Sequence, residues 1–228
     1  MKRDLVQACR ILAAEGQADN IYGHVSARIA ASDSIWIKGA GVGLDEVRQQ
    51  HLARLDHGGR VLEGWPRRHE EFPIHTELMR ARADVGAVVH THPKFGIAFA
   101  ARGLELRPVS HEGAYFWPPG VPVFSAFTDL VRTPAQGEAV ARALGHARAI
   151  FLRNHGVAVV GPSVAEACIA ALMLERAAEL QLLASAGGAH VHHTEEDEAL
   201  RKKAIWYPGA IRASFDYLVR KHHLAEIG

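Results

Sequence analysis

The chain has 228 residues, of which 48% are hydrophobic and 22% charged, and its formal net charge is +1. This length and composition fit one globular domain over residues 1–228, and the balanced charge argues against a protein that binds nucleic acid or an anionic membrane through a broad basic surface. No apolar run reaches the length of a membrane span, and the first residues lack the apolar core of a signal peptide, so we expect a cytoplasmic protein.

Hydrophobic periodicity and turn residues predict the secondary structure in chain order. The predicted elements are a helix over 5–14, a hairpin of strands 25–30 and 34–37, a second hairpin of strands 52–55 and 60–62, a helix over 70–83, a strand over 84–89, a helix over 93–102, a strand over 121–124, a helix over 134–144, strands over 149–152 and 157–160, a helix over 164–184, and two helical segments on either side of Pro208-Gly209. Thr133 and Ser163 are expected as N-caps, and Glu166 lies three residues after Ser163 as in a capping box.

Strands interleaved with helices, without strict alternation, predict the fold class. They favour a three-layer α/β/α domain with a mixed, largely antiparallel central sheet. Cys9 and Cys168 lie in helical patterns among small apolar neighbours, so we expect buried free thiols rather than a disulfide.

Three histidines carry the strongest functional signal. His90-Thr91-His92 follows the apolar run at 84–89, and side chains at i and i+2 of a strand point to the same face, so His90 and His92 can lie side by side. His155 follows Asn154 and precedes Gly156 in a turn-like segment. Three imidazoles on one side of a divalent metal ion leave positions open for water or substrate.

The residue pattern leaves an alternative open for these histidines. Chance alone produces a His-x-His pair in a chain with 15 histidines. Buried neutral histidines need polar partners, and hydrogen bonds in the core satisfy them as a metal ion does. The same donor set accepts zinc, manganese, iron or cobalt, so the sequence does not identify the metal.

Four motifs resemble the class II aldolase and adducin family, which includes fuculose-phosphate aldolase and ribulose-phosphate epimerase. They are Gly23-His24-Val25-Ser26-Ala27-Arg28, Glu71-x-x-x-His75, Val89-His90-Thr91-His92-Pro93 and Asn154-His155-Gly156, in the family's order and spacing. The resemblance implies the α/β/α fold, one divalent ion per subunit bound by His90, His92 and His155, and Glu71 as a further ligand or as an acid/base. It also implies a homotetramer with active sites between subunits, and zinc in aldolase relatives or manganese in the decarboxylase branch.

Two departures from the family pattern disfavour a phosphorylated sugar. Sugar-phosphate members carry an asparagine where this chain has His24, and a hydroxyl-rich segment where it has residues 67–70, of which Glu70 would repel a phosphate. The backbone of Gly39 and Gly41 could still meet an anion, but no Ser or Thr supports it.

A small carboxylate is therefore the expected substrate. We expect His24, Gly39, Gly41, Lys38 and Arg28 to bind it. Bracing of the sheet is the favoured alternative for Arg28, and an exposed surface position is the alternative for Lys38.

The segment 109–120 is rich in aromatic and ionisable side chains and resembles the family's decarboxylase branch, whose members act on hydroxylated aromatic dicarboxylates. Tyr115 lies where aldolase members place a tyrosine proton donor that reaches a neighbouring subunit, with packing at an interface as the alternative. Breaking a carbon–carbon bond leaves an electron pair that a Lewis-acidic metal ion stabilises. Tyr115, Glu71 or His111 would then protonate the carbon.

The sequence thus predicts a metal-dependent carbon–carbon lyase that decarboxylates a hydroxylated aromatic or heteroaromatic carboxylic acid. An aldolase for a small hydroxy-carbonyl or sugar compound is the alternative enzyme. A non-catalytic, adducin-like assembly module is the alternative of a different class, and the presence of all three histidines and Glu71 argues against it.

Overall fold

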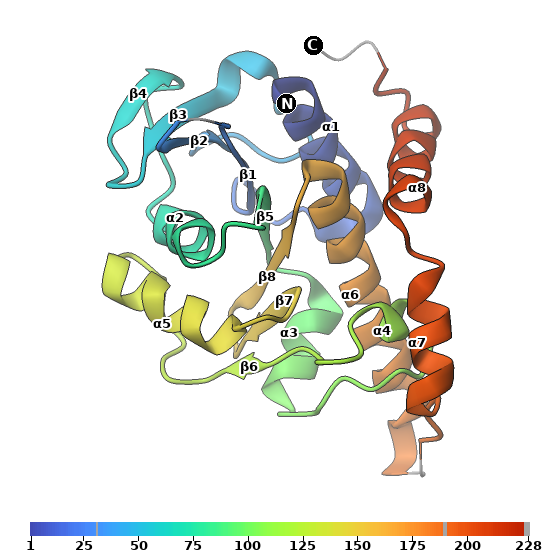
Figure 1. Cartoon of the computed structure of the whole chain (residues 1–228). Helices are drawn as coiled ribbons and strands as arrows, with labels where there is room; N and C mark the ends of the chain where they lie inside the picture. The colour runs from blue at the N-terminus through green and yellow to red at the C-terminus, as the bar shows by residue number, and fades with distance from the viewer. Residues whose placement is uncertain (31, 189–190, 226–228) are drawn as a thin grey trace.

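A computed structural model of the chain describes residues 1–30, 32–188 and 191–225. An eight-stranded sheet forms its centre, in the order β4-β3-β2-β1-β5-β8-β7-β6 (Figure 1). The strands are β1 (His24–Arg28), β2 (Ser34–Lys38), β3 (Leu52–Asp56), β4 (Val61–Gly64), β5 (Ala87–Thr91), β6 (Val123–Phe124), β7 (Ala149–Leu152) and β8 (Gly156–Gly161). Neighbouring strands are antiparallel except β6 and β7, which confirms the mixed, largely antiparallel sheet.

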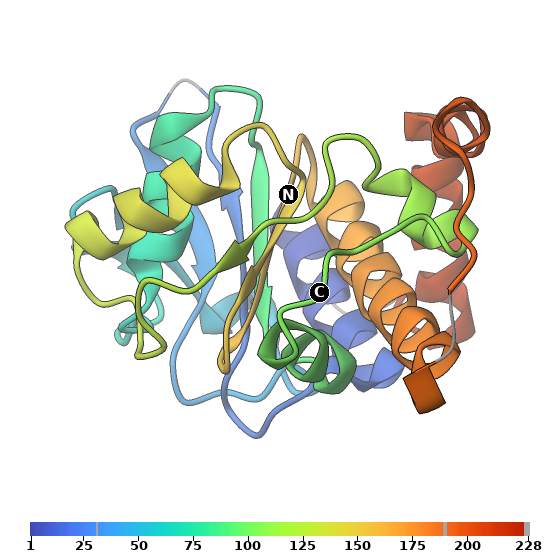
Figure 2. The same cartoon turned by 90° about the horizontal axis from the view of Figure 1, so that it is seen from below.

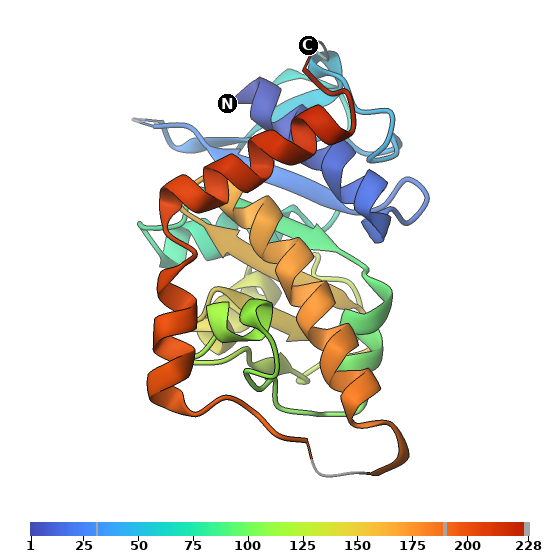
Figure 3. The same ribbon diagram turned by 90° about the vertical axis from the view of Figure 1, so that its right-hand side faces the viewer.

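Helices cover both faces of this sheet (Figure 2). On one face lie α2 (Phe72–Ala81) and α5 (Pro134–Leu144), and on the other lie α1 (Lys2–Leu12), α3 (Lys94–Ala101) and α6 (Val164–Ala184). A further set packs outside α6, consisting of α4 (His111–Tyr115), α7 (Glu196–Ala204) and α8 (Pro208–Lys221) (Figure 3). Single turns of helix occur at Ala13–Gln17, Gln49–His51 and Ala186–Gly188. The predicted three-layer α/β/α fold is confirmed.

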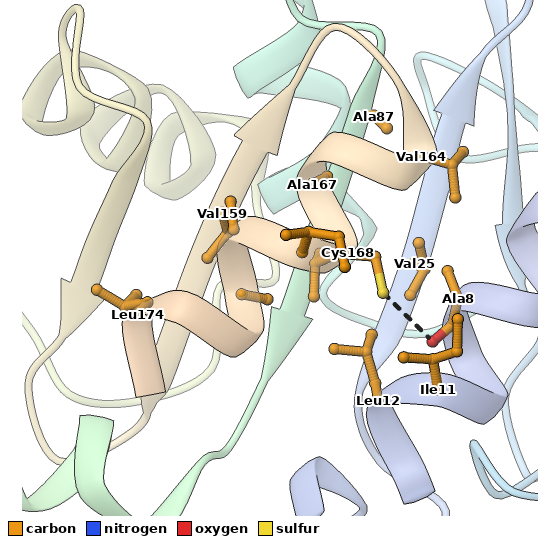
Figure 4. Packing of buried hydrophobic residues seen from close by; sticks show 14 of the residues in the cluster. Ala8, Ile11, Leu12, Val25, Ala87, Val159, Val164, Ala167, Cys168 and Leu174 are labelled. Atoms are coloured by element: carbon orange, nitrogen blue, oxygen red, sulfur yellow. Dashed lines mark hydrogen bonds between the residues drawn. The ribbon is translucent and has the colours of Figure 1, made fainter. Parts of the chain in front are cut away.

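The pleat of the strands divides the core into two apolar clusters. On β5, Val89 packs in the cluster that faces α1 and α6, whereas Val88 packs in the cluster under α2 and α5. Figure 4 shows the first cluster, where Cys168 of α6 lies against Ala8 of α1, with its Sγ 3.9 Å from the Ala8 carbonyl oxygen. Both cysteines are buried and free, as expected. Burying these apolar side chains contributes about 25 cal/mol per Å² removed from water.

Several elements differ from the prediction at their ends, for local reasons. The strand predicted at 84–89 begins only at Ala87, because the preceding residues turn toward the end of β8. The strand predicted at 121–124 is reduced to Val123–Phe124, since Pro122 has no N–H for a ladder. Ser163 caps α6 as predicted, but the Glu166 carboxylate binds Tyr115 and Arg148 rather than completing a capping box.

One end of the sheet gathers the predicted functional residues. Since β5 runs antiparallel to both neighbours, its end lies beside the start of β1 and the start of β8. His24 is the direct cross-strand partner of His90 in this register. Among the described residues, no helix is both long and apolar enough to cross a membrane.

Candidate metal centre and its pocket

Glu71, His90, His92 and His155 form a cluster at this end of the sheet, with one ligand atom from each within 4.8 Å of the others. The Nε2 atom of His90 lies 3.1 Å from Nε2 of His92 and 3.5 Å from Oε2 of Glu71. The Nε2 atom of His155 lies 3.4 Å from Oε1 of Glu71. Three imidazoles and one carboxylate are a donor set that could hold a divalent ion.

A tight turn brings the third imidazole to the other two. Asn154 has a φ of +56°, in the left-handed region that asparagine tolerates, and it reverses the chain between β7 and β8. Gly156 then passes so close to β5 that a Cβ atom there would lie 2.5 Å from the Thr91 carbonyl oxygen and 2.8 Å from the His92 ring. The Asn154-His155-Gly156 motif is therefore required by the backbone path that places His155.

Glu71 enters the cluster from the residue that precedes α2 and is buried. Its Oε1 accepts the backbone N–H of Val131 at 2.9 Å, which fixes the carboxylate. Burial alone would raise the pKa of Glu71, but its contacts with His155 and His90 outweigh burial and hold that pKa well below the ordinary value. The group is thus an anion that faces two imidazoles.

Hydrogen bonds to the histidines show that the cluster fits a cation. His90 donates its Nδ1–H to the Val157 carbonyl at 2.9 Å, and His92 donates its Nδ1–H to Asp19 at 2.8 Å. In the neutral rings both Nε2 atoms then carry lone pairs, which face each other at 3.1 Å. Burial lowers the pKa of His90 although Glu71 opposes it, and the buried Nε2 of His155 has no hydrogen-bond partner. A divalent ion would satisfy all three nitrogens.

A pocket of about 590 Å³ opens beside the cluster. The loops before β1, after β2 and before α2 supply most of its lining, which is Ile21, Tyr22, Gly23, His24, Ala40, Gly41, Arg67, Arg68, His69, Glu70, Glu71, His92 and Leu130. Because Glu71 and His92 belong to both the cluster and the pocket, a small molecule bound here would lie against the metal centre.

His24 forms part of the pocket wall and is held from behind by a core histidine. Its Nδ1 lies 2.6 Å from Nε2 of His75, and Nδ1 of His75 lies 2.6 Å from the hydroxyl of Ser26. Burial, aided by neighbouring histidines, lowers the pKa of both His24 and His75 well below the ordinary value, so both rings are neutral. The His24 ring also lies 4.9 Å from the His90 ring.

Lys38 is fully buried and does not reach the pocket mouth, which corrects both interpretations from the sequence. Its ammonium group donates to the Ile21 carbonyl at 3.0 Å and contacts Nε2 of His69 at 3.1 Å. Burial lowers the pKa of Lys38 to about 8, and burial followed by the Lys38 charge lowers the pKa of His69 to about 3. Lys38 therefore ties two of the pocket's loops together from the inside.

The two glycines expected to bind an anion differ in position. The Gly39 N–H donates to the His51 carbonyl at 2.8 Å, and a Cβ there would lie 2.0 Å from Trp65, so this N–H is not free for an anion. Gly41 lines the pocket with a φ of +83°, and its missing side chain leaves space for the Arg67 guanidinium. Its role toward an anion stays a prediction.

Arg28 is not a pocket residue in this structure. Its guanidinium donates to the backbone carbonyls of Met79, Arg82 and Val85, at the end of α2 and the start of the following turn. These contacts hold the end of α2 and the turn that follows it to β1. The substrate-binding role is corrected to the bracing role that the sequence left as the alternative.

Tyr115 and His111 also lie away from this pocket within the subunit. Tyr115 is only 1% exposed, and its hydroxyl donates to Glu166 at 3.0 Å and accepts from Arg148 at 2.9 Å. Burial raises the pKa of Tyr115. His111 is an exposed residue at the start of α4, where its carbonyl accepts from Trp206. The packing interpretation is therefore favoured for Tyr115.

Sequence reasoning missed Asp19 and Val131, which hold His92 and Glu71 respectively. A single carboxylate in a turn has no spacing that marks it, and a backbone N–H leaves no trace in the residue type. Only the polar turn sequence Asp19-Asn20 after α1 could have directed attention to this loop.

Comparison with known proteins gives a consistent relationship. Residues 3–182 match the model of the class II aldolase and adducin N-terminal domain. The chain is 35% identical to a 3,4-dihydroxyphthalate decarboxylase of Terrabacter sp. over 212 residues, which is 87% of each chain. It is 36% identical to the 3,4-dihydroxyphthalate decarboxylase of Arthrobacter keyseri over 197 residues, which covers 80% of this chain and 78% of that one.

Solved structures with the same fold include an L-fuculose 1-phosphate aldolase from Glaciozyma antarctica. It superposes with a TM-score of 0.85 at 27% identity, covering 97% of this chain and 89% of that one. An aldolase II superfamily protein from Pseudomonas syringae superposes with a TM-score of 0.87 at 26% identity, covering 99% of this chain and 93% of that one. These likenesses extend over nearly the whole chain.

Proposed function

Because the chain belongs to the class II aldolase and adducin family, we propose that it is a divalent-metal-dependent lyase that decarboxylates a hydroxylated aromatic carboxylic acid. One observation carries the proposal, which is the convergence of Glu71, His90, His92 and His155 beside a pocket that shares two of them. The likeness to two decarboxylases at 35% and 36% identity supports decarboxylation over aldol cleavage.

We assign His90, His92 and His155 to a metal ion, with Glu71 as the fourth ligand. A divalent ion held there supplies Lewis-acid stabilisation for the negative charge that develops when a carbon–carbon bond breaks. The chain's contribution is to keep the donors aimed, because the bonds from His90 to Val157 and from His92 to Asp19 fix both rings. Zinc and manganese both suit this mixed nitrogen and oxygen donor set.

The charges around the pocket favour a carboxylate. Arg67 and Arg68 line it, and the Arg68 guanidinium lies 4.2 Å above the ring of Phe72. Glu70, which was expected to repel anions, pairs with Arg132 at 2.9 Å, so its charge is largely offset. A guanidinium can bind a carboxylate through two parallel hydrogen bonds.

Protonation of the carbon that loses carbon dioxide must come from a group that reaches the substrate. Tyr22 lines the pocket and carries an exchangeable proton, whereas the hydroxyl of Tyr115 is buried between Glu166 and Arg148. We therefore assign this step to the pocket wall rather than to Tyr115 of the same subunit. As a metal ligand, Glu71 would not also serve as the acid that protonates the carbon.

Retro-aldol cleavage is the second candidate, since the same donor set would stabilise the charge formed in that reaction and the fold is that of an L-fuculose 1-phosphate aldolase. A non-catalytic assembly module has no need for a complete donor set beside a pocket. We further propose a cytoplasmic homotetramer with active sites between subunits. Exposed apolar side chains near α7 and α8 offer surface for such contacts, namely Leu200, Ile205, Tyr207 and Tyr217.

Product analysis distinguishes these reactions. The purified protein is stripped of metal, reloaded with zinc or manganese, and incubated separately with 3,4-dihydroxyphthalate and with L-fuculose 1-phosphate. Carbon dioxide and a dihydroxybenzoate, formed only by the loaded protein, are the expected products. An aldehyde from the sugar phosphate without carbon dioxide from the aromatic acid would support the aldolase, and inactivity toward both with no metal bound would support the assembly module.

A further inference from the structure

Gln17 is a buried polar side chain that joins the histidine-bearing strand to α6. Its exposed fraction is only 2%, and its Oε1 accepts the hydroxyl proton of Thr91 at 2.7 Å. Its Nε2 donates to the Ala171 carbonyl of α6 at 3.0 Å. All three groups are enclosed by protein, where a hydrogen bond is costly to leave unmade.

Thr91 lies between two proposed ligands, on the opposite face of the strand. Successive side chains of a strand alternate, so His90 faces α2 and Glu71 while Thr91 faces α6. Fixing the Thr91 side chain therefore fixes the rotation of the backbone that carries His90 and His92. The hydrogen bond between Thr91 and Gln17 therefore acts on the two histidines from the opposite face of the strand.

The same short segment also holds His92 directly. Gly16 lies in the turn Ala13–Gln17 that follows α1 and has a φ of +86°, and Ala18 is extended, with φ −74° and ψ 135°. In extended backbone residues i and i+2 point the same way, so Gln17 and Asp19 both face the strand. Gln17 reaches Thr91 while Asp19 reaches Nδ1 of His92.

A second set of hydrogen bonds holds the segment that follows His92 in the chain. The Glu175 carboxylate of α6 accepts the backbone N–H groups of Phe95 at 2.8 Å and of Gly96 at 2.7 Å, at the start of α3. The residues from Thr91 to Gly96 are thus tied to α6 at both ends. Pairing of β5 with its neighbouring strands does not by itself require these additional hydrogen bonds.

We propose that Gln17 is a positioning residue of the metal centre, acting through the hydroxyl of Thr91 to set the geometry of His90 and His92. The inference rests on the proposed function, because it assumes that these histidines bind the metal. Replacing groups that orient ligands typically weakens metal binding by about 10–100-fold. Because Gln17 acts one residue further out than such groups, the expected loss is about tenfold, at the lower limit of that range.

Four variants and one control test the inference. Gln17→Met and Thr91→Val each remove one side of the hydrogen bond with little change in shape, and the double variant removes both. Thr91→Ser keeps the hydroxyl and is the conservative rescue. Thr76→Val is the matched control, since Thr76 is a fully buried threonine whose hydroxyl donates to the Phe72 carbonyl and to the Glu77 carboxylate, both in α2.

The measurements are the Kd for Zn²⁺ by competition with a chromophoric chelator, the visible spectrum of the Co²⁺-loaded protein, and the Tm of the metal-free protein. We expect Gln17→Met and Thr91→Val to raise the Kd about tenfold and to change the Co²⁺ spectrum. Thr91→Ser should stay within about threefold of wild type, and the double variant should be no worse than the poorer single variant, because the two share one contact.

The outcomes separate this inference from the proposed function. If the variants lower only the Tm of the metal-free protein and leave the Kd and spectrum at wild-type values, Gln17 has a structural role and the inference is overturned. The same holds if Thr76→Val weakens zinc as much as Thr91→Val does. A wild-type protein that binds no divalent ion contradicts the proposed function itself, and the positioning role with it.

Discussion

His90 and His92 present their Nε2 atoms to each other at 3.1 Å, while the opposite nitrogen of each ring donates a hydrogen bond to a fixed acceptor. Two neutral rings cannot hold this arrangement without repulsion between lone pairs. A cation shared by the two nitrogens would remove the repulsion. The relationship therefore supports the proposed metal site more directly than the spacing of the histidines does.

Asp19→Asn should weaken metal binding although it keeps an oxygen that can accept from His92. The carboxylate raises the basicity of the ring that it orients, so we expect the Kd for Zn²⁺ to rise by about tenfold or more. Titration against a competing chelator measures it. Asp33→Asn is the control, because Asp33 contacts His57 at 3.2 Å, far along the sheet from the cluster. Equal effects of the two substitutions would contradict the orienting role.

Gly156→Ala should disrupt the centre through the backbone. The added methyl group would lie 2.5 Å from the Thr91 carbonyl oxygen, so β8 and β5 must separate there. We expect a loss of about 1–3 kcal/mol in the free energy of unfolding, as for other overpacked sites, and loss of stoichiometric zinc. Urea unfolding and metal analysis check both. Gly58→Ala, whose methyl group would meet only the side chain of Asp56 at 3.3 Å, should leave zinc binding unchanged.

Glu71→Gln should separate a ligand role from an acid/base role. The amide oxygen can still accept from Val131, so the fold should persist, but the charge next to His90 and His155 is lost. As a ligand variant it should bind Zn²⁺ at least about tenfold more weakly. Unchanged zinc affinity with a reduced kcat would instead assign Glu71 to proton transfer. Glu70→Gln, next to it and exposed, is the matched control for charge.

Lys38 should give the protein a measurable dependence of stability on alkaline pH. Burial lowers the pKa of Lys38 from 10.5 to about 8 in the folded chain. Between these values the unfolded chain holds a proton that the folded chain has lost, so raising the pH through this range stabilises the folded state. Below pH 8 both states are protonated and the contribution is constant.

The test compares wild type with Lys38→Met by urea unfolding at pH 7 and pH 10. The stability of wild type relative to the variant should increase by on the order of 1–3 kcal/mol at the higher pH. Because other titrating groups are common to both proteins, they largely cancel in the difference. A difference that stays constant, or that falls with pH, would contradict a buried Lys38 with a lowered pKa.

The order of the elements could be predicted because each element leaves a periodic trace in the sequence, and the residues around the three histidines singled them out as candidates. An apolar run before His90 and a turn around His155 are local patterns, and each element follows from its own residues. The resemblance to the family motifs then indicated that His90, His92 and His155 lie close together in the fold. The capping box predicted at Ser163 forms only in part. The Ser163 hydroxyl accepts from the Glu166 backbone N–H as predicted, but the Glu166 carboxylate binds Arg148 instead of the N-cap backbone.

The support around the cluster could not be predicted, since it depends on contacts between distant segments. Asp19 binds His92 across 73 residues, and Val131 binds Glu71 across 60 residues through its backbone. Tyr115 shows the converse, because a tyrosine in the expected motif has its hydroxyl occupied by Glu166 and Arg148. Residue type and spacing indicate which groups are able to act, and the packing decides which of them reach the site.

Anomalous scattering from crystals grown with Mn²⁺ or Zn²⁺ tests the central claim most directly. The account predicts one strong peak per chain, within about 2.0–2.3 Å of a nitrogen of each of His90, His92 and His155. It also predicts that the peak disappears in His155→Ala. A peak bound by other residues, or none at this end of the sheet, would contradict the account.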